Sequence, residues 1–424
     1  MINYKRLISA LIILTFTGLT IAQTSTNSPY TRYGFGSLAD QGFGNSKAMG
    51  GIAYGLRNGY QINASNPASY TAVDSLTFLF DASMTLQNAN FKEGNIKTNA
   101  KNSSFDYLAM QFRLWKRMGM AVGFLPFSTV GYSLSNTSEL TKDEDGTVIN
   151  KTASYAGDGG LQQVFAGVGF KVLDNLSIGA NISYIYGDIT HSVTTAFSNS
   201  SSFSSVRLDK ISINDYKLDF GLQYSYKFNK KHVLNFGAVY SLGHSVNGKG
   251  YKYNQKWLNG ADYPSTQTGD TITNAFSLPH TFGAGLTYVY DNRLTIGADF
   301  TYQQWEDAKF YNEKSYFSNR TKIAAGAEFV PNPYSRNYLK RVRYRVGGYY
   351  SDPYTKVDGQ DGTREYGVSA GFGFPLFQSK SILNISGQYV RVSPKVKGML
   401  EENYLKINIG LTFNERWFMK WKVD

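Results

Sequence analysis

The stretch Leu176-Ser-Ile-Gly-Ala-Asn-Ile-Ser-Tyr-Ile-Tyr186 decides the fold, because apolar and small polar side chains alternate along it. Successive side chains of a β-strand point to opposite faces. The stretch therefore has an apolar face, with Ile178 and Ile182, and a polar face, with Ser177 and Asn181. The pattern recurs from residue 76 to residue 413 in segments of about ten residues, which is typical of a closed transmembrane barrel.

We predict an all-β protein, a transmembrane antiparallel β-barrel of about 14 strands. Lys217 and Asp219 alternate with apolar residues in one of these strands, so their face must point away from lipid. The predicted strands span 76–86, 104–114, 117–127, 160–171, 175–186, 215–228, 231–242, 280–290, 293–304, 321–330, 342–350, 365–376, 381–392 and 404–413.

The connections between these strands alternate in length. Short connections lie at 115–116, 172–175, 229–230, 291–292 and 377–380. Long polar stretches, predicted as loops, lie at 87–103, 128–159, 187–214, 243–279, 305–320, 351–364 and 393–403. Bacterial barrels place short turns in the periplasm, so we expect both termini on the periplasmic side. The connection 331–341 is longer than the other short ones, and the pattern does not explain it.

The ends of the chain differ from the predicted barrel at 76–413. Residues 1–22 have the features of a signal peptide: Lys5 and Arg6, then an apolar run, then small residues. Export and a barrel together predict the outer membrane of a Gram-negative cell. Residues 414–424 form a tail rich in aromatic and basic residues. The chain has no Cys, which excludes disulfides and a lipoprotein anchor.

Residues 23–75, which we call the leader, do not alternate. They are rich in Gly, Asn, Ser and Tyr. Such a segment is too polar for a core helix and long enough to fill part of a barrel lumen. Composition alone leaves two interpretations open: a plug inside the barrel, or an arm in the periplasm.

Three motifs of the leader give a resemblance to a known family. They are Ser28-Pro-Tyr-Thr-Arg-Tyr-Gly-Phe-Gly36, Ala48-Met-Gly-Gly51 and Asn66-Pro-Ala-Ser69, with a weaker match at Leu278-Pro279 and Gly283. On these motifs the chain resembles the outer-membrane long-chain fatty acid transporter family, the FadL/TodX group, and particularly its Bacteroidetes-type members. The resemblance implies fourteen strands, an N-terminal hatch in the lumen and passage of hydrophobic molecules.

The resemblance also implies site residues. The family's Asn-Pro-Ala turn belongs to the hatch, and this role carries to Asn66, Pro67 and Ala68. Asn can bond its own backbone and Pro fixes φ, so such a turn is stiff; a plain bend into the first strand is the alternative. The other residues that we assign to the hatch and its gating are Tyr30, Arg32, Tyr33, Gly34, Phe35, Met49, Gly50 and Gly51.

The family opens its wall at a kink in the third strand. In this chain the corresponding strand contains Gly119, Gly123 and Pro126. Gly within a strand marks bulges and Pro cannot donate to a ladder, so a lateral opening is expected here. The alternative is that Pro126 only ends the strand at the rim.

Other classes of site find little support. Gly34-Phe-Gly-Ser-Leu-Ala39 matches a dinucleotide fingerprint in letters but lacks the βαβ context. The four His residues have no metal spacing and no identifiable Ser partner, so we expect no enzyme activity, no metal and no cofactor. Nucleic acid is not expected as a partner. A basic run is formed by Arg336, Lys340, Arg341, Arg343 and Arg345. We interpret it either as a docking patch for a periplasmic partner or inner-leaflet head groups, or as a solvated rim whose long side chains lie along the wall.

These observations favour a passive outer-membrane channel for hydrophobic or amphipathic, fatty-acid-like small molecules, in contact with outer-membrane lipid and gated by the hatch. The alternative is an outer-membrane port or scaffold that binds a protein partner in secretion or surface attachment. A closed wall needs no partner to cover its edges, so a monomer is expected.

Overall fold

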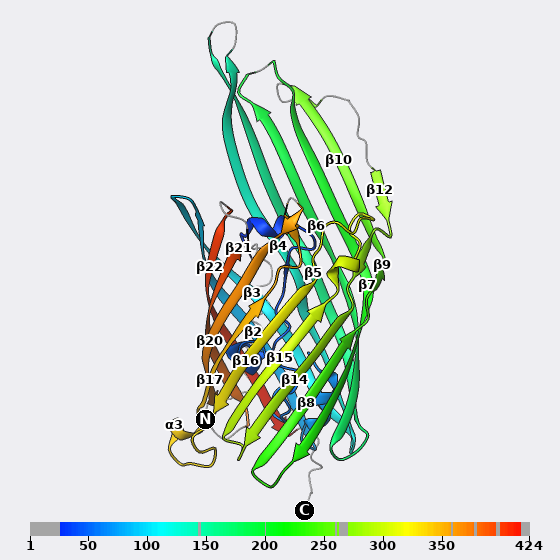
Figure 1. Ribbon diagram of the computed structural model, residues 1–424, viewed down its shortest axis with the longest axis vertical. Helices are drawn as coiled ribbons and strands as arrows, with labels where there is room; N and C mark the ends of the chain where they lie inside the picture. Colours follow the sequence, from blue (N-terminus) through cyan, green and yellow to red (C-terminus); the bar gives the residue numbers. More distant parts are fainter. Residues whose placement is uncertain are drawn as a thin grey trace, which may run out of the picture.

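The computed structural model describes residues 26–142, 146–199, 201–258, 261–262, 270–357, 359–376, 380–395 and 399–416. The predicted signal peptide, 1–22, and tail residues 417–424 lie outside this part of the chain. Fourteen antiparallel strands form a closed barrel, because the last strand pairs with the first over Thr77↔Arg416 to Lys92↔Glu401. The predicted fold class and strand number are therefore confirmed (Figure 1).

In chain order, the barrel strands are β2 (Thr77–Glu93), β3 (Ile96–Trp115), β4 (Met118–Lys142), β5 (Val148–Lys171), β6 (Leu176–Phe197), β7 (Ser204–Lys227), β8 (His232–Ser241), β14 (Thr281–Tyr290), β15 (Leu294–Gln303), β16 (Arg320–Phe329), β17 (Arg343–Ser351), β20 (Thr363–Pro375), β21 (Ile382–Pro394) and β22 (Glu401–Arg416). Before the barrel come the 3-10 helices η2 (Pro29–Arg32) and η3 (Pro67–Ala72), the strand β1 (Ser37–Leu38) and the helix α2 (Gly44–Ala48). The connections contain β9 (His244–Val246), β10 (Gly248–Leu258), β11 (Ala261–Asp262), β12 (Asp270–Thr273), β13 (Phe276–Leu278), η4 (Trp305–Asp307), α3 (Tyr338–Arg341), β18 (Lys356–Val357) and β19 (Gln360–Asp361). No described helix is long and apolar enough to cross a bilayer.

The two faces of the wall follow the alternation in the sequence. Ile178 and Ile182 are 44% and 58% exposed on the outside, whereas Ser177 and Asn181 are 2% and 4% exposed on the inside. An apolar outer face suits contact with lipid and a polar inner face suits a wet lumen. Lys217 and Asp219 also face inward, where they form an ion pair.

Four of the predicted loops are wrong, and one of these, 243–279, contains the strands β9 to β13. Residues 87–103, 128–159 and 187–214 mostly continue the strands β2 to β7 well past the predicted ends. Together with β10 and β12, the long ends of β4 to β7 form a sheet that rises beyond the rest of the barrel, which we call the wing (Figure 1). Both faces of the wing meet water over much of their area, so the sequence loses its alternation there and the polar stretches resemble loops.

The short connections all lie at the opposite end of the barrel, which we call the turn end. The longer connection at residues 331–341, which the sequence pattern did not explain, contains α3. Asn337 caps this helix by accepting a hydrogen bond from the Leu339 N–H at 3.0 Å.

The leader packs against inward-facing glycines of the wall. Gly119, Gly169, Gly179 and Gly221 pair in one row across β4 to β7, and we call them the glycine row. A Cβ atom at Gly179 would lie 2.4 Å from the carbonyl carbon of Pro67, so η3 touches the bare backbone of the wall. Met49 is seated in the same way against Gly326 and Gly347. Small residues on the inner face thus make the room that the leader occupies.

Gly179→Leu should displace η3 from the wall, because the added side chain overlaps Pro67. Overpacking of this kind costs about 1–3 kcal/mol. We expect the barrel to fold but the leader to be cleaved faster in limited proteolysis of the detergent-solubilised protein. Gly387→Leu is the control, since nothing lies within 4 Å of a Cβ atom at that position. Equal cleavage of the two variants would contradict the packing argument.

Candidate functional site: a break in the wall bridged by the leader

The barrel wall is interrupted between β3 and β4. The two strands pair from Trp115↔Met118 only as far as Leu108↔Phe124. Beyond that point, β3 pairs with β2 alone, and β4 pairs with β5 on its other side. The closed wall at the turn end thus opens into two unpaired strand edges higher up.

Local irregularities mark the level of this break. The β2–β3 register shifts between Ser83 and Met84, and the shift leaves Asp106 without a paired residue. The β4–β5 register shifts between Pro126 and Ser128. A bulge bends its strand and Pro has no N–H to donate, so both strands turn away from regular pairing at the same height.

Part of the leader fills the edge of β4. The strand β1 pairs antiparallel with β4 through Ser37↔Thr129 and Leu38↔Ser128. The Ala39 N–H donates to the Phe127 carbonyl at 3.0 Å, and the Gln41 amide donates to the Pro126 carbonyl at 3.2 Å. Backbone groups of β4 that β3 leaves free are therefore satisfied by the leader.

The following part of the leader holds the edge of β3. The Gly44 N–H donates to the Tyr107 hydroxyl at 2.7 Å. Lys47 forms a 3.0 Å ion pair with Asp106, and their side chains are 8% and 9% exposed. Ser37–Lys47 thus reaches from one edge of the break to the other, and we call this segment the strap.

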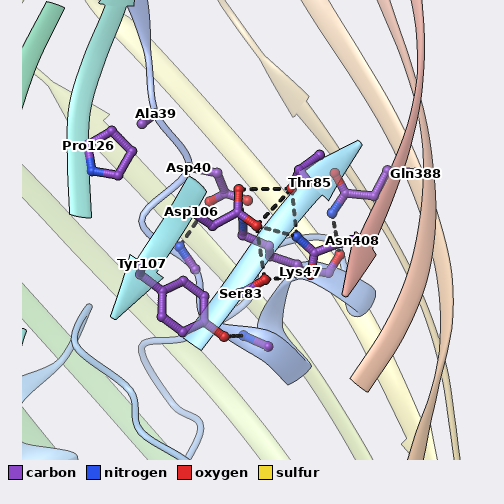
Figure 2. A network of polar contacts seen from close by, with 12 residues as sticks. Ala39, Asp40, Lys47, Ser83, Thr85, Asp106, Tyr107, Pro126, Gln388 and Asn408 are labelled. Carbon is purple, nitrogen blue, oxygen red and sulfur yellow. Dashed lines mark hydrogen bonds and ion pairs between the residues drawn. The ribbon is translucent and has the colours of Figure 1, made fainter. Parts of the chain in front are cut away.

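Asp106 is the centre of a buried polar network at this point (Figure 2). Ser83 and Thr85 of β2 donate their hydroxyls to its carboxylate, and Asn408 of β22 donates its amide. The Gln388 amide donates to the Lys47 carbonyl at 2.7 Å, which fixes the end of the strap. The residue left unpaired by the bulge is therefore bound by three elements of the chain.

An aromatic cluster lies above the break, on the side of the wing. Phe35 is fully buried there, with ring centroids 6.0 Å from Trp305, 5.4 Å from Phe310 and 5.9 Å from Phe317. The flanking Gly34 and Gly36 have φ of 60° and 84°, a conformation that favours glycine. The predicted Gly-Phe-Gly motif thus inserts one ring into the core of the connections.

A cavity of about 1510 Å³ runs from the lumen to the break. Its lining includes Gln41 of the strap, Asp106 and Pro126 of the two strand edges, and the outward-facing Met84 and Phe105. Residues of the inner face and of the outer face of the wall line the same space, so the cavity is continuous across the wall.

Beside the break, on the outer face, lies an apolar groove of about 530 Å³. Leu108 and Phe124, the last paired residues before the break, line both the groove and the cavity. The exposed Val164, Ile182 and Tyr184 complete its apolar surface. An apolar surface therefore continues from the break onto the part of the wall that faces lipid.

The predicted hatch residues occupy several different places. The Asn66 side chain accepts a hydrogen bond from the Ala68 N–H and donates to the Tyr54 and Leu222 carbonyls, which ties η3 to β7. Gly50 donates its N–H to the Ser369 hydroxyl, next to Met49 and Gly51. Tyr30 donates to the Leu400 carbonyl, Arg32 lies over the Tyr155 ring, and the Tyr33 N–H donates to the Tyr30 carbonyl.

The predicted kink residues are divided between two features. Pro126 lies at the break and Gly123 one residue before the last paired position, whereas Gly119 belongs to the glycine row and lies under Tyr70. Lys47 and Asp106 were missed. A charged residue within the predicted strand 104–114 was the available signal for Asp106. Among the described residues, no group of three or more His, Asp or Glu side chains could hold a metal ion.

The chain therefore folds as a closed antiparallel β-barrel with an interrupted wall, and solved barrels share this fold. The chain is similar in structure to the CymD monoaromatic hydrocarbon channel (13% identity, 90% of this chain, 100% of that chain, TM-score 0.57). It is also similar to a Pseudomonas aeruginosa FadL homologue (13% identity, 89% of this chain, 99% of that chain, TM-score 0.58). A third similar structure is the Pseudomonas putida toluene transporter TodX (15% identity, 90% of this chain, 100% of that chain, TM-score 0.55). The predicted likeness to the FadL/TodX group is confirmed.

A family model described as BamG matches residues 1–424, so the chain belongs to the BamG family. No curated protein matches the chain.

Lys47→Met should loosen the strap, because it breaks a buried ion pair. Removing one partner of such a pair costs about 3 kcal/mol or more. We expect the free energy of unfolding to fall by that amount in urea titrations of the solubilised barrel. Lys380→Met is the control: its pair with Asp74 is more than half exposed, and exposed pairs contribute about 1 kcal/mol at most. Equal losses in the two variants would show that the strap ion pair is unimportant.

Proposed function

We propose that this protein is a passive outer-membrane channel for hydrophobic or amphipathic, fatty-acid-like small molecules, which leave the lumen sideways through the break between β3 and β4. The observation that carries this proposal is the continuity of the cavity across the wall. Two structurally similar proteins, a monoaromatic hydrocarbon channel and a toluene transporter, support the same substrate class.

The physical logic favours a lateral exit. An apolar solute gains about 25 cal/mol for each Å² of apolar surface that leaves water, so lipid is a better destination than the periplasm. The apolar groove that begins at Leu108 and Phe124 offers such a solute a continuous surface. The mechanism needs no energy source and no catalytic step.

In this proposal the leader is the hatch, and the strap is its moving part at the break. Asn66, Pro67 and Ala68 anchor the hatch on β7, whereas Met49, Gly50 and Gly51 seat it on β16 and β17. Gly123 and Pro126 belong to the lateral opening. The turn end lies in the periplasm with both termini, and the barrel acts as a monomer.

A disulfide across the strap should close the channel. Leu38 and Ser128 are paired residues of antiparallel strands, a spacing that a disulfide can bridge, and the natural chain has no Cys. We expect Leu38→Cys with Ser128→Cys to abolish protein-dependent uptake of labelled toluene or long-chain fatty acid in oxidised cells. A reductant should restore the uptake.

The matched control is Thr137→Cys with Thr152→Cys, which joins paired residues of β4 and β5 in the wing. This second disulfide should leave uptake unchanged. The channel proposal fails if cells with and without the wild-type protein take up both compounds equally. The gating proposal alone fails if uptake depends on the protein but both disulfide variants transport normally.

A second candidate function is an outer-membrane port or scaffold for a protein partner. The observation that favours it is the free edge of the wing. Ser133–Lys142 of β4 is exposed and pairs with β5 on one side, and no other described strand pairs with it. A free strand edge can accept a strand from another chain.

A photo-crosslinking amino acid at position 137 tests this second function. We expect one discrete protein adduct of near-stoichiometric yield in native membranes, because the position lies on the free edge. The same amino acid at position 249, within the paired strand β10, should give no such adduct. The absence of an adduct at position 137 would remove the protein-port function and leave the channel.

A further inference from the structure

The connection Val330–Val342, which contains α3, carries positive charge without a counter-charge. Arg336, Lys340 and Arg341 lie in it, and it contains no Asp or Glu. None of these three side chains has an ion pair with a carboxylate in the part of the chain that the structure describes. The next two cations differ, because Arg343 and Arg345 both pair with the buried Glu328 inside the barrel.

The connection lies on the outer side of the wall. The Tyr344 hydroxyl donates to the Leu339 carbonyl at 3.1 Å, which ties α3 to β17. Tyr344 alternates with the inward-facing Arg343 and Arg345 and packs edge-on against Phe372, an exposed outward-facing residue of β20. In Figure 1, α3 accordingly projects sideways from the turn end rather than lying beneath the lumen.

Apolar side chains accompany the cations. Tyr334 is 89% exposed and Leu339 is 64% exposed, and Arg341 lies 5.5 Å from the centre of the Tyr338 ring. Aromatic residues gather at the boundary between hydrocarbon and water, and Arg and Lys beside them reach the charged head groups. The connection therefore has the composition of a membrane-interface segment, and Tyr344 and Phe372 place it at that level.

We propose that Val330–Val342 binds the head group of an anionic phospholipid in the inner leaflet of the outer membrane. Leu339 and Tyr334 contact the acyl chains near the head groups, and Arg336, Lys340 and Arg341 bind the phosphate. Charge complementarity selects this ligand, since three cations without a described acidic partner lie in a connection on the outer side of the wall. The site rests on the proposed orientation, in which the turn end is periplasmic, but not on any transported substrate.

Native mass spectrometry of the purified barrel with phosphatidylglycerol and phosphatidylcholine tests the site. A triple variant, Arg336→Gln with Lys340→Gln and Arg341→Gln, is compared with a control, Lys142→Gln with Lys249→Gln and Lys256→Gln. The control removes the same charge from exposed positions of the wing. Each Lys or Arg near an anionic surface contributes about 1 kcal/mol, so the triple variant should bind phosphatidylglycerol about a hundredfold more weakly. The control should bind it like the wild type.

Equal retention of the two lipids by the wild-type protein, or equal phosphatidylglycerol binding by both variants, would overturn the proposal. A photo-crosslinking amino acid at position 339 identifies the neighbour in native membranes. A lipid-sized mass increase supports the site, and a discrete protein adduct overturns it in favour of a periplasmic protein. The uptake assay is a separate readout, so failure of this site and failure of the channel are distinguishable.

Discussion

The need to satisfy backbone hydrogen bonds at the break in the wall is the constraint on which the rest of the structure depends. In hydrocarbon there is no water to bond an open strand edge, so a membrane barrel can leave such an edge only where protein or a wet cavity covers it. The strap fills this role on β4 through β1, whereas on β3 it is held by contacts of Gly44 and Lys47 with the side chains of Tyr107 and Asp106. The glycine row serves a later part of the leader, because it leaves space on the inner face for η3.

The alternation in the sequence predicted the barrel well because the membrane imposes it. Lipid outside and a polar lumen inside divide each strand into two kinds of side chain, as in β6, where Ile182 faces out and Asn181 faces in. The wing could not be predicted in this way, since both of its faces meet water and its exposed residues Ser133–Lys142 carry no alternation. Periodicity therefore predicts strands in the barrel wall, whose two faces meet different surroundings, but not in the wing.

Only part of the candidate site could be predicted from the sequence. Pro126 was visible, because a Pro within a strand must disturb a ladder locally. The ion pair between Lys47 and Asp106 was not visible, because its partners belong to segments far apart in the chain and meet only when the leader enters the barrel. The same holds for Phe35, whose aromatic neighbours come from connections near residues 276, 305, 310 and 317.

The two ends of the strap are held by different kinds of contact, and this difference determines how much the release of each end would cost. On β4 the contacts are largely backbone pairs, so their loss would leave unpaired peptide groups beside lipid, at several kcal/mol each. On β3 the contacts run through side chains. Without Lys47, Asp106 would keep hydrogen bonds from Ser83, Thr85 and Asn408. In the proposed channel, the β4 end is therefore the costlier end to release, and its pairing controls whether the strap can leave the break.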